Sequence, residues 1–189
     1  MIKAGYNDKE QIVNILTASF DDNKSVNYIV KQDSKRKQRI RLLMEYSFDV
    51  CFHFGKIFLS GDTKACALIL LPDKKKTTFR SAWSDIKLIF GCIGISNVSK
   101  AMNREAKIKA LQPKEPIYYL WFIGVSPEAQ GKGIGSKLLK EVISDSGFEK
   151  RIICLETSTT KNIPWYQKFG FTTYNKLNLG YELFFLKKE

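Results

Sequence analysis

The stretch GVSPEAQGKGIGSKLL, residues 124–139, joins a run of strand-forming residues to an amphipathic helix. The preceding residues, Pro116–Val125, are mostly aromatic or β-branched, with apolar side chains on both faces, which predicts a buried central strand. Gly131, Gly133 and Gly135 keep Cβ atoms out of the loop and let backbone N–H groups turn inward. The start of the following helix adds unpaired N–H groups and its dipole. The stretch therefore predicts a binding site for an anion, above all for a phosphate group.

Two common phosphate loops do not fit this stretch. A Walker A loop requires G-x-x-x-x-G-K-[ST], but Gly135 is followed by Ser136 and then Lys137, so the hydroxyl and the lysine are interchanged. A dinucleotide fingerprint requires G-x-G-x-x-G, but Gly131 and Gly133 are followed by Ser136 where the third glycine belongs. The loop must therefore hold its phosphate in another way.

The rest of the chain alternates between strand and helix patterns. Length and composition indicate one domain over residues 1–189, with enough apolar residues for a core. The expected strands and helices make a mixed α/β sheet with helices on its faces. We expect strands at residues 2–5, 56–60, 64–72, 116–125 and 151–158, two more within 172–188, and a helical insertion at about 73–114. The apolar face of this insertion covers either a substrate cleft or simply the sheet.

Charge and cysteine content limit the classes of partner. The net charge of +12 indicates an anionic partner, such as a phosphorylated cofactor, nucleic acid or an acidic surface. The basic block at residues 31–41 is either a solvated helix face or a specific anion site, and it lacks the interleaved aromatics of a nucleic-acid binder. The four cysteines are dispersed in apolar runs without C-x-x-C spacing, so we expect buried reduced thiols, no metal site and a cytoplasmic protein. We find no apolar stretch long enough to span a membrane.

Two separate motifs resemble those of one enzyme superfamily. Gln130, Gly133 and Gly135 form Q-x-x-G-x-G, and ETSTTKNIPWYQKFGF at residues 156–171 carries N…Y-x-x-x-G-F. Both resemble the GNAT-superfamily N-acetyltransferases, in this order and at this separation. The resemblance covers residues 118–171, extends to 2–20 and 56–71, and is absent across 73–114. It implies the acyl-CoA N-acyltransferase fold, a mostly antiparallel central sheet of about six to seven strands with helices on both faces.

The resemblance also implies where acetyl-CoA binds as a co-substrate. In the family, the pantetheine arm pairs with strand-four backbone where that strand bulges and parts from strand five, which assigns this role to Ile123 and Val125. Gly124 is expected to permit the bulge or a close approach. Asn162 is expected to bond the pantetheine amides, or else to cap a helix that continues with Pro164. The pyrophosphate is expected on the loop that follows Gln130, at the N–H groups of Gly131, Lys132, Gly133, Ile134, Gly135 and Ser136.

Acetyl transfer to an amine needs an acid for the leaving thiolate and a base for the amine. Tyr166 matches the family's tyrosine general acid; its alternative role is packing, and we expect the adjacent Trp165 to be the core residue. Family members with a base on strand four carry His or Glu there, but this chain has Tyr119 and Trp121. Glu156 on strand five is the best remaining candidate, and a structural salt bridge or hydrogen bond is its alternative role.

The sequence therefore predicts an acetyl-CoA-dependent N-acetyltransferase that acts on a primary amine of a small molecule, peptide or protein by direct attack. A non-catalytic acyl-CoA-binding module is the alternative, and a basic nucleic-acid-binding protein is a weaker one. His53 lies outside the motifs, and we expect it to be packed between Phe52 and Phe54. We expect a monomer or homodimer without membrane or nucleic-acid partners, and a basic surface that favours acidic or neutral acceptors over polyamines.

Overall fold

The structure is a computed structural model of the 189-residue chain, and it describes residues 1–75, 89–94 and 97–189. The described strands form one sheet of seven strands in the order β1-β2-β3-β4-β5-β7-β6. All neighbouring strands are antiparallel except β4 and β5, which are parallel. The strands are β1 (Ile2–Lys3), β2 (Gly55–Leu59), β3 (Ala65–Leu70), β4 (Ile117–Val125), β5 (Ile152–Thr157), β6 (Thr172–Asn178) and β7 (Glu182–Lys188).

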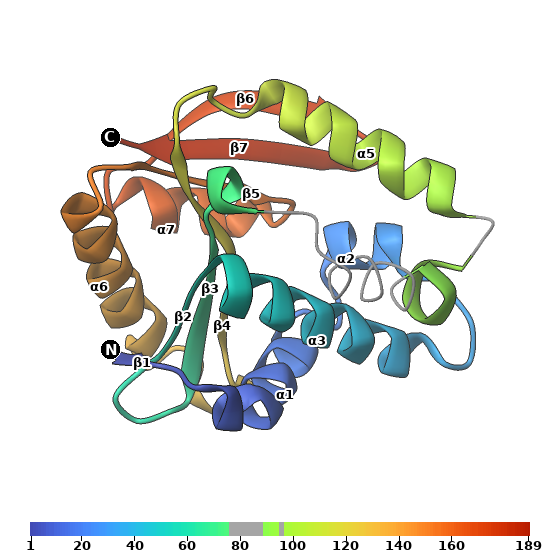
Figure 1. Ribbon diagram of the computed structural model, residues 1–189, viewed down its shortest axis with the longest axis horizontal. Coiled ribbons are helices and arrows are strands. Elements are labelled where there is room, and N and C mark those ends of the chain that lie inside the picture. The colour runs from blue at the N-terminus through green and yellow to red at the C-terminus, as the bar shows by residue number, and fades with distance from the viewer. Residues whose placement is uncertain (76–88, 95–96) are drawn as a thin grey trace.

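Helices cover both faces of this sheet (Figure 1). The α-helices in the described residues are α1 (Lys9–Ser19), α2 (Lys24–Ile29), α3 (Arg36–Phe54), α5 (Val98–Leu111), α6 (Ile134–Phe148) and α7 (Ile163–Gln167). Short helical turns are η1 (Tyr6–Asp8), η2 (Pro72–Lys74), the π-helical η3 (Ile89–Ile93), η5 (Pro127–Ala129) and η6 (Thr160–Asn162). The predicted fold class, a mixed and mostly antiparallel sheet with helices on both faces, is confirmed.

Alternation along the strands sorts the core into two layers. On β3, Leu68 packs with α1 and α3, whereas its neighbours Ala67 and Ile69 pack with α6 and α7. Helix α1 contributes apolar side chains at helical spacing, Ile12, Ile15 and Leu16, to the first layer. The apolar strand β3 is thus buried on both faces.

Helix α5 covers the far half of the sheet on the same side as α1 and α3. Its residue Ile108 packs with Leu183 and Phe185 of β7, and α5 runs along β6 and β7 in Figure 1. The predicted helical insertion at 73–114 contains η3 and α5, and its residues 76–88 and 95–96 lie outside the described part. Helix α5 therefore packs against the sheet, which is one of the two roles expected for this insertion.

Candidate active site

Strands β4 and β5 are paired for only part of their length. Their parallel ladder joins Ile117 to Ile152, Tyr118 to Ile153 and Tyr119 to Cys154, and no later pair joins them among the residues described. Strand β4 nevertheless continues through residue 125, and β5 through residue 157. Beyond Tyr119, therefore, two strand edges in the middle of the sheet leave backbone groups unpaired, which is rare inside a sheet.

A bulge marks the start of this separation. The register between β3 and β4 shifts at Leu68 and Ile69, which makes Trp121 the extra residue on β4. We expected Gly124 to permit the bulge or a close approach; the bulge lies instead at Trp121, and Gly124 is the site of close packing by α1. A Cβ atom at Gly124 would lie 3.0 Å from the Leu16 side chain, so this glycine lets α1 pack closely on β4.

The backbone of Ile123 and Val125 faces the open edge. The N–H of Ser126 donates to the Lys64 carbonyl, just before β3, so the backbone groups of Ser126 point toward β3. Backbone groups alternate in direction along a strand, and those of Ile123 and Val125 therefore point the other way, toward β5. The Val125 carbonyl already accepts from Ser19 Oγ at 2.8 Å and from Gln130 Nε2 at 3.1 Å. The N–H groups of Ile123 and Val125 and the Ile123 carbonyl are therefore the groups that alternation leaves for a ligand.

The glycine loop that follows β4 is open. Gly131 and Gly133 have φ values of 76° and 78°, in the left-handed region that favours glycine, and a Cβ atom at either would meet nothing within 4 Å. The first helical hydrogen bond of α6 runs from Lys137 N to Gly133 O at 3.0 Å. In the described part of the chain, no acceptor takes the amide N–H groups of residues 131–136. These amides and the start of a 15-residue helix are available to an anion.

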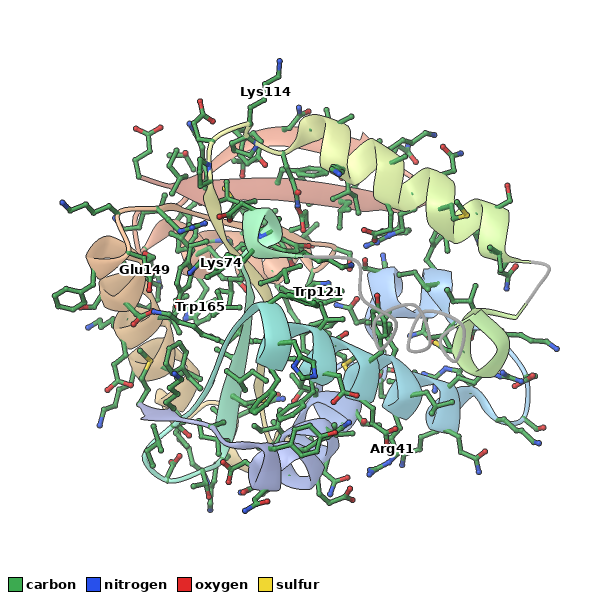
Figure 2. The ribbon with its side chains drawn as sticks, in the orientation of Figure 1. Arg41, Lys74, Lys114, Trp121, Glu149 and Trp165 are labelled. Atoms are coloured by element: carbon green, nitrogen blue, oxygen red, sulfur yellow. The ribbon has the colours of Figure 1, made fainter. Side chains whose placement is uncertain are left out.

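Helix α7 is fastened to the start of α6. Trp165 Nε1 donates to Ser136 Oγ at 2.9 Å, and Figure 2 shows Trp165 beside α6. The Ser136 hydroxyl proton is then free to point elsewhere, because this hydroxyl accepts the bond. Asn162 occupies the position before α7 but makes no capping hydrogen bond, so its expected capping bond is absent.

Tyr166 is the buried member of the aromatic pair on α7. It is 6% exposed and packs with Phe171 in the layer formed by α6 and α7, whereas Trp165 is partly exposed. The expectation that Trp165 is the core residue was wrong, because its indole N–H needs a polar partner at the edge of the layer. The Tyr166 hydroxyl has no hydrogen-bond partner within residues 1–75, 89–94 and 97–189. Burial raises the pKa of Tyr166, so the phenol stays protonated.

Glu156 lies on the other face of the sheet, at the same break between β4 and β5. Its carboxylate accepts a short hydrogen bond from the Tyr119 hydroxyl and a 3.1 Å bond from Gln112 Nε2. Burial raises the pKa of Glu156, while these bonds and the charge of Arg104 act in the opposite direction. Burial also raises the pKa of Tyr119 well above its usual value, and the Glu156 charge raises it further. No ion pair to Glu156 is found among the described residues. Of the two structural roles expected for Glu156, the structure therefore shows the hydrogen bond and not the salt bridge.

A family comparison identifies this arrangement. The acetyltransferase (GNAT) domain family matches residues 76–173, which is more than half of the chain. The chain belongs to the GNAT acetyltransferase family. The match begins inside the segment 73–114, where we expected no resemblance, so that expected boundary was wrong.

Curated relatives match this GNAT chain over short stretches. A probable serine/threonine-protein kinase of Dictyostelium discoideum is 33% identical over 79 residues, which are 41% of this chain and 8% of the relative. An uncharacterized N-acetyltransferase of Schizosaccharomyces pombe is 37% identical over 62 residues, 33% of this chain and 25% of the relative. The chain thus spans a quarter or less of the length of these relatives.

Solved structures match the GNAT fold over nearly the whole chain. A histone acetyltransferase HPA2 and related acetyltransferase from Corynebacterium glutamicum has a TM-score of 0.75 at 22% identity, covering 99% of this chain and 93% of that one. The C-terminal condensation domain of Ebony, in complex with beta-alanyl-dopamine, has a TM-score of 0.73 at 9% identity, covering 100% and 97%. Arylalkylamine N-acetyltransferase 2 from Aedes aegypti has a TM-score of 0.65 at 15% identity, covering 99% and 96%. At these identities the similarity shows the fold.

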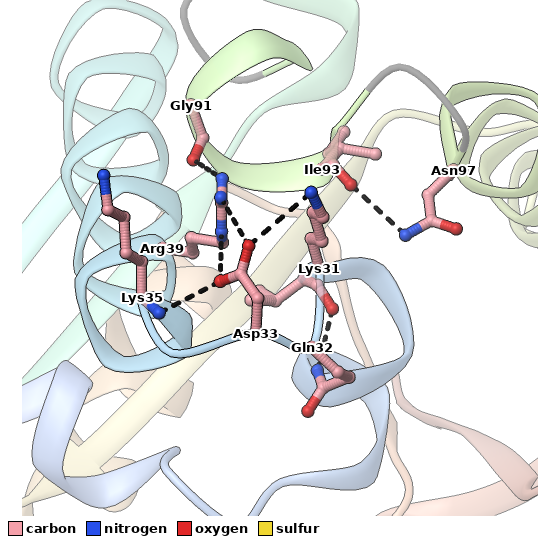
Figure 3. A network of polar contacts seen from close by, with 9 residues as sticks. Lys31, Gln32, Asp33, Lys35, Arg39, Gly91, Ile93 and Asn97 are labelled. Atoms are coloured by element: carbon pink, nitrogen blue, oxygen red, sulfur yellow. Dashed lines mark hydrogen bonds and ion pairs between the residues drawn. The ribbon is translucent and has the colours of Figure 1, made fainter.

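The basic block of this GNAT protein is largely neutralised by local carboxylates. Arg36 pairs with Asp21 at 2.8 Å, and Arg39 pairs with Asp33 at 2.7 Å. Figure 3 shows Arg39 also donating to the Gly91 carbonyl, which fastens η3 to the start of α3. Arg36 and Arg39 therefore serve the fold through ion pairs, a role that neither expected alternative included.

His53 does not contribute to the site. It is exposed in the last turn of α3, with ring contacts to Phe52 and Phe54 at 5.7 Å and 6.2 Å. The expectation of a packed histidine was therefore wrong about burial and correct about its neighbours.

Within the described ranges, no group of three His, Cys, Asp or Glu side chains is placed to hold a metal ion, and no helix is long and apolar enough to cross a membrane.

The sequence reasoning missed the side chains that surround Glu156. Gln112 follows α5 and Arg104 lies within it, both in the segment that carried no motif. Tyr119 was considered only as a base, not as a donor to Glu156. Arg104 was the signal in the sequence that could have indicated this cluster. It is a charged residue at helical spacing from Ala101 and Ile108, on the apolar side of α5.

A shallow depression of about 690 Å³ lies apart from these residues. It opens between α1, the turn between β2 and β3, and residues Ser126–Glu128. None of the residues 130–136 lines it, and neither does Tyr166 or Glu156. The open loop and the break in the sheet, not this depression, therefore define the candidate site.

Proposed function

We propose that this GNAT protein transfers an acetyl group from acetyl-CoA to a primary amine by direct attack. The observation that carries the proposal is the coincidence of two features at one end of β4. The strand parts from β5 after Tyr119, and the loop that follows it presents unpaired amides at the start of α6.

The proposed acetyl-CoA site uses these features together. The N–H groups of residues 131–136 and the Ser136 hydroxyl would bind the pyrophosphate, and Lys132 and Lys137 are exposed nearby. Hydrogen bonds to charged groups contribute about 1.5–3 kcal/mol each, so several would support micromolar affinity. The pantetheine arm would pair with Ile123 and Val125, and the unbonded side chain of Asn162 would donate to its amides.

The proposed chemistry places an acid and a base on opposite faces of the break. The amine nitrogen bonds to the thioester carbonyl carbon, its proton passes to Glu156, and the carbon–sulfur bond breaks. The leaving thiolate takes the proton of Tyr166, whose raised pKa keeps that proton in place until the thiolate forms. The Ile123 N–H would stabilise the oxyanion.

Glu156 suits the role of base because burial raises its pKa toward that of an amine. The two hydrogen bonds that it accepts act on its pKa in the opposite direction to burial and hold its orientation. A non-catalytic acyl-CoA-binding module is the second candidate, and the burial of Tyr166 is the observation that favours it.

The free cysteines are all buried, which is consistent with a reducing compartment such as the cytoplasm.

Calorimetric titration with acetyl-CoA, followed by thiol release across a panel of amines, tests the proposal. Gly133→Ala places a Cβ atom and a strained φ in the loop and should weaken acetyl-CoA binding about tenfold or more. Gly180→Ala is the matched control, since Gly180 also has a positive φ of 86° and open space, but lies in the turn between β6 and β7. Absence of acetyl-CoA binding would overturn the proposal, and binding without thiol release would favour the non-catalytic module.

A further inference from the structure

A buried guanidinium lies on the helix that packs over the Glu156 face of the sheet. Arg104 of α5 is 8% exposed, although arginine is almost never buried unless it is paired. Its Nη1 donates to Glu105 Oε1 at 2.7 Å, its Nη2 to Ser25 Oγ at 2.5 Å and its Nε to Tyr181 OH at 3.2 Å. Arginine has five N–H donors, so two remain without an acceptor among the residues that the structure describes.

The charge of Arg104 is poorly compensated. Glu105 is its ion-pair partner, but the Glu105 side chain is 67% exposed. Water screens the charge of an exposed carboxylate, so this ion pair stabilises the buried guanidinium only weakly. Ser25 and Tyr181 are neutral, and Tyr181 donates its own proton to Ser25 Oγ at 3.3 Å. The cluster of Arg104, Ser25 and Tyr181 thus carries a positive charge and several hydrogen-bond donors. A carboxylate binds well to such a cluster, because it accepts hydrogen bonds and carries the opposite charge.

Arg104 and Glu156 act in the same polar region but are not bonded to each other. Arg104 lies close enough for its charge to lower the pKa of both Glu156 and Tyr119. Ser25 joins this region to the residue that follows β5, because its N–H donates to Ser158 Oγ at 3.3 Å. Arg104 is joined through Ser25 to Ser158, two residues after Glu156, and Gln112 at the end of α5 is bonded to Glu156 itself. The cation and the carboxylate therefore lie near the same end of β5, each held by a different element.

We propose that the acceptor is a primary amine that also carries a carboxylate, such as a free amino acid, with its carboxylate on Arg104 and its amine toward Glu156. This inference rests on the proposed function and names the acceptor class of that same site. A buried arginine should discriminate strongly between acceptors with and without a carboxylate. An acceptor that lacks the carboxylate would leave the guanidinium both removed from water and without a counter-charge.

Matched acceptor pairs on the wild-type protein test this inference. Each pair consists of an amino acid and its carboxamide, for example glycine with glycinamide and phenylalanine with phenylalaninamide, and spermidine is added as a polyamine. Thiol release gives kcat/KM, which is compared per concentration of neutral amine because the carboxamides have less basic amines. We expect the carboxylate forms to be favoured about 100-fold or more. Equal values within each pair, or spermidine as the best acceptor, would overturn the inference.

Substitution of Arg104 adds a second readout. Arg104→Met should abolish the preference for the carboxylate form, mainly through KM, while acetyl-CoA affinity stays unchanged. Lys107→Met removes the same charge from the exposed face of α5 and should leave the preference intact. If Arg104 only fastened α5 to α2, Arg104→Met would lower thermal stability without changing the ratio within each pair, and this would contradict the inference.

The two proposals fail in different ways. If no amine releases thiol from acetyl-CoA, the proposed function itself is wrong. If amines react but the carboxylate has no effect on kcat/KM, only the acceptor class is wrong. The paired acceptors on the wild-type protein decide this even if Arg104→Met does not fold.

Discussion

Tyr118 and Tyr119 are adjacent on β4 and point to opposite faces of the sheet, and each donates its hydroxyl to a carboxylate. Tyr118 donates to Asp145 Oδ2 at 2.7 Å, and Lys56 Nζ bonds the same oxygen at 2.7 Å. Lys56 also pairs with Glu149 at 2.7 Å. Tyr119 donates to Glu156, which has no bonded cation among the residues described. The same tyrosine–carboxylate contact therefore occurs once with a compensating charge and once without it.

The compensating lysine decides what each cluster can do. On the α6 face, the hydrogen bond from Lys56 holds the pKa of Glu149 below its usual value, so the ion pairs fasten α6 to β2. On the other face, burial raises the pKa of Glu156, which suits a group that must take up a proton. Carboxylates in ion pairs thus stabilise the fold, whereas the proposed site keeps a carboxylate that has no ion pair among the residues described.

The largest expected effect is the loss of activity in Glu156→Gln. Removing the base should lower kcat/KM for the best amine by about 10²–10³-fold, while acetyl-CoA affinity by calorimetry stays the same. Glu149→Gln is the matched control on the compensated cluster and should leave kcat/KM unchanged. Activity of Glu156→Gln within about threefold of wild type would remove Glu156 from the mechanism.

Lys56→Met should have the next largest effect, and on stability instead of activity. It leaves Asp145 and Glu149 without their shared cation, and the partial exposure of Lys56 limits the cost to about 2 kcal/mol of unfolding free energy. Denaturant unfolding measures this, with Lys140→Met on the exposed face of α6 as the control. An unchanged midpoint for Lys56→Met would show that the ion pairs do not stabilise the fold.

Tyr118→Phe and Tyr119→Phe separate the two clusters within one strand. Tyr118→Phe removes one donor from Asp145 and should cost about 1 kcal/mol of stability without changing the pH dependence of kcat/KM. Tyr119→Phe removes a hydrogen bond that lowers the pKa of Glu156, so the acid limb of the kcat/KM profile should move to higher pH. Two variants with identical pH profiles would refute this difference.

The smallest expected effect is an opposite pH dependence of stability for the two glutamates. The pKa of Glu149 is below its ordinary value of 4.5, so its stabilisation is present above that pH and is lost as the pH falls through the folded value. The pKa of Glu156 is above 4.5, so its ionisation in the folded state costs stability at higher pH, and this cost disappears on acidification.

Thermal unfolding between acidic and neutral pH measures these slopes. Glu149→Gln should lose less stability on acidification than wild type, because the lost contribution is already absent. Glu156→Gln should be more stable than wild type near neutral pH, and this gain should vanish below about pH 4.5. Changes of the same sign in both variants would contradict the comparison.

Local sequence patterns predicted the elements that depend only on neighbouring residues. The strand, glycine loop and helix of residues 116–143 follow from apolar runs and from glycines at positions with positive φ. Alternation along β5 placed Glu156 on a face separate from Leu155, and the structure agrees. Such patterns are readable because side-chain direction repeats every two residues in a strand and about every 3.6 in a helix.

The surroundings of those residues became known from the packing of distant segments. Glu156 is bonded to Gln112, 44 positions earlier, and Arg104 reaches Ser25, 79 positions away, contacts that no local pattern contains. The choice between Trp165 and Tyr166 for the core also depended on Ser136, 29 positions from Trp165, as the partner of the indole N–H. The physical reason is that burial and charge compensation are properties of packed neighbours, and packing brings together residues that the chain keeps far apart.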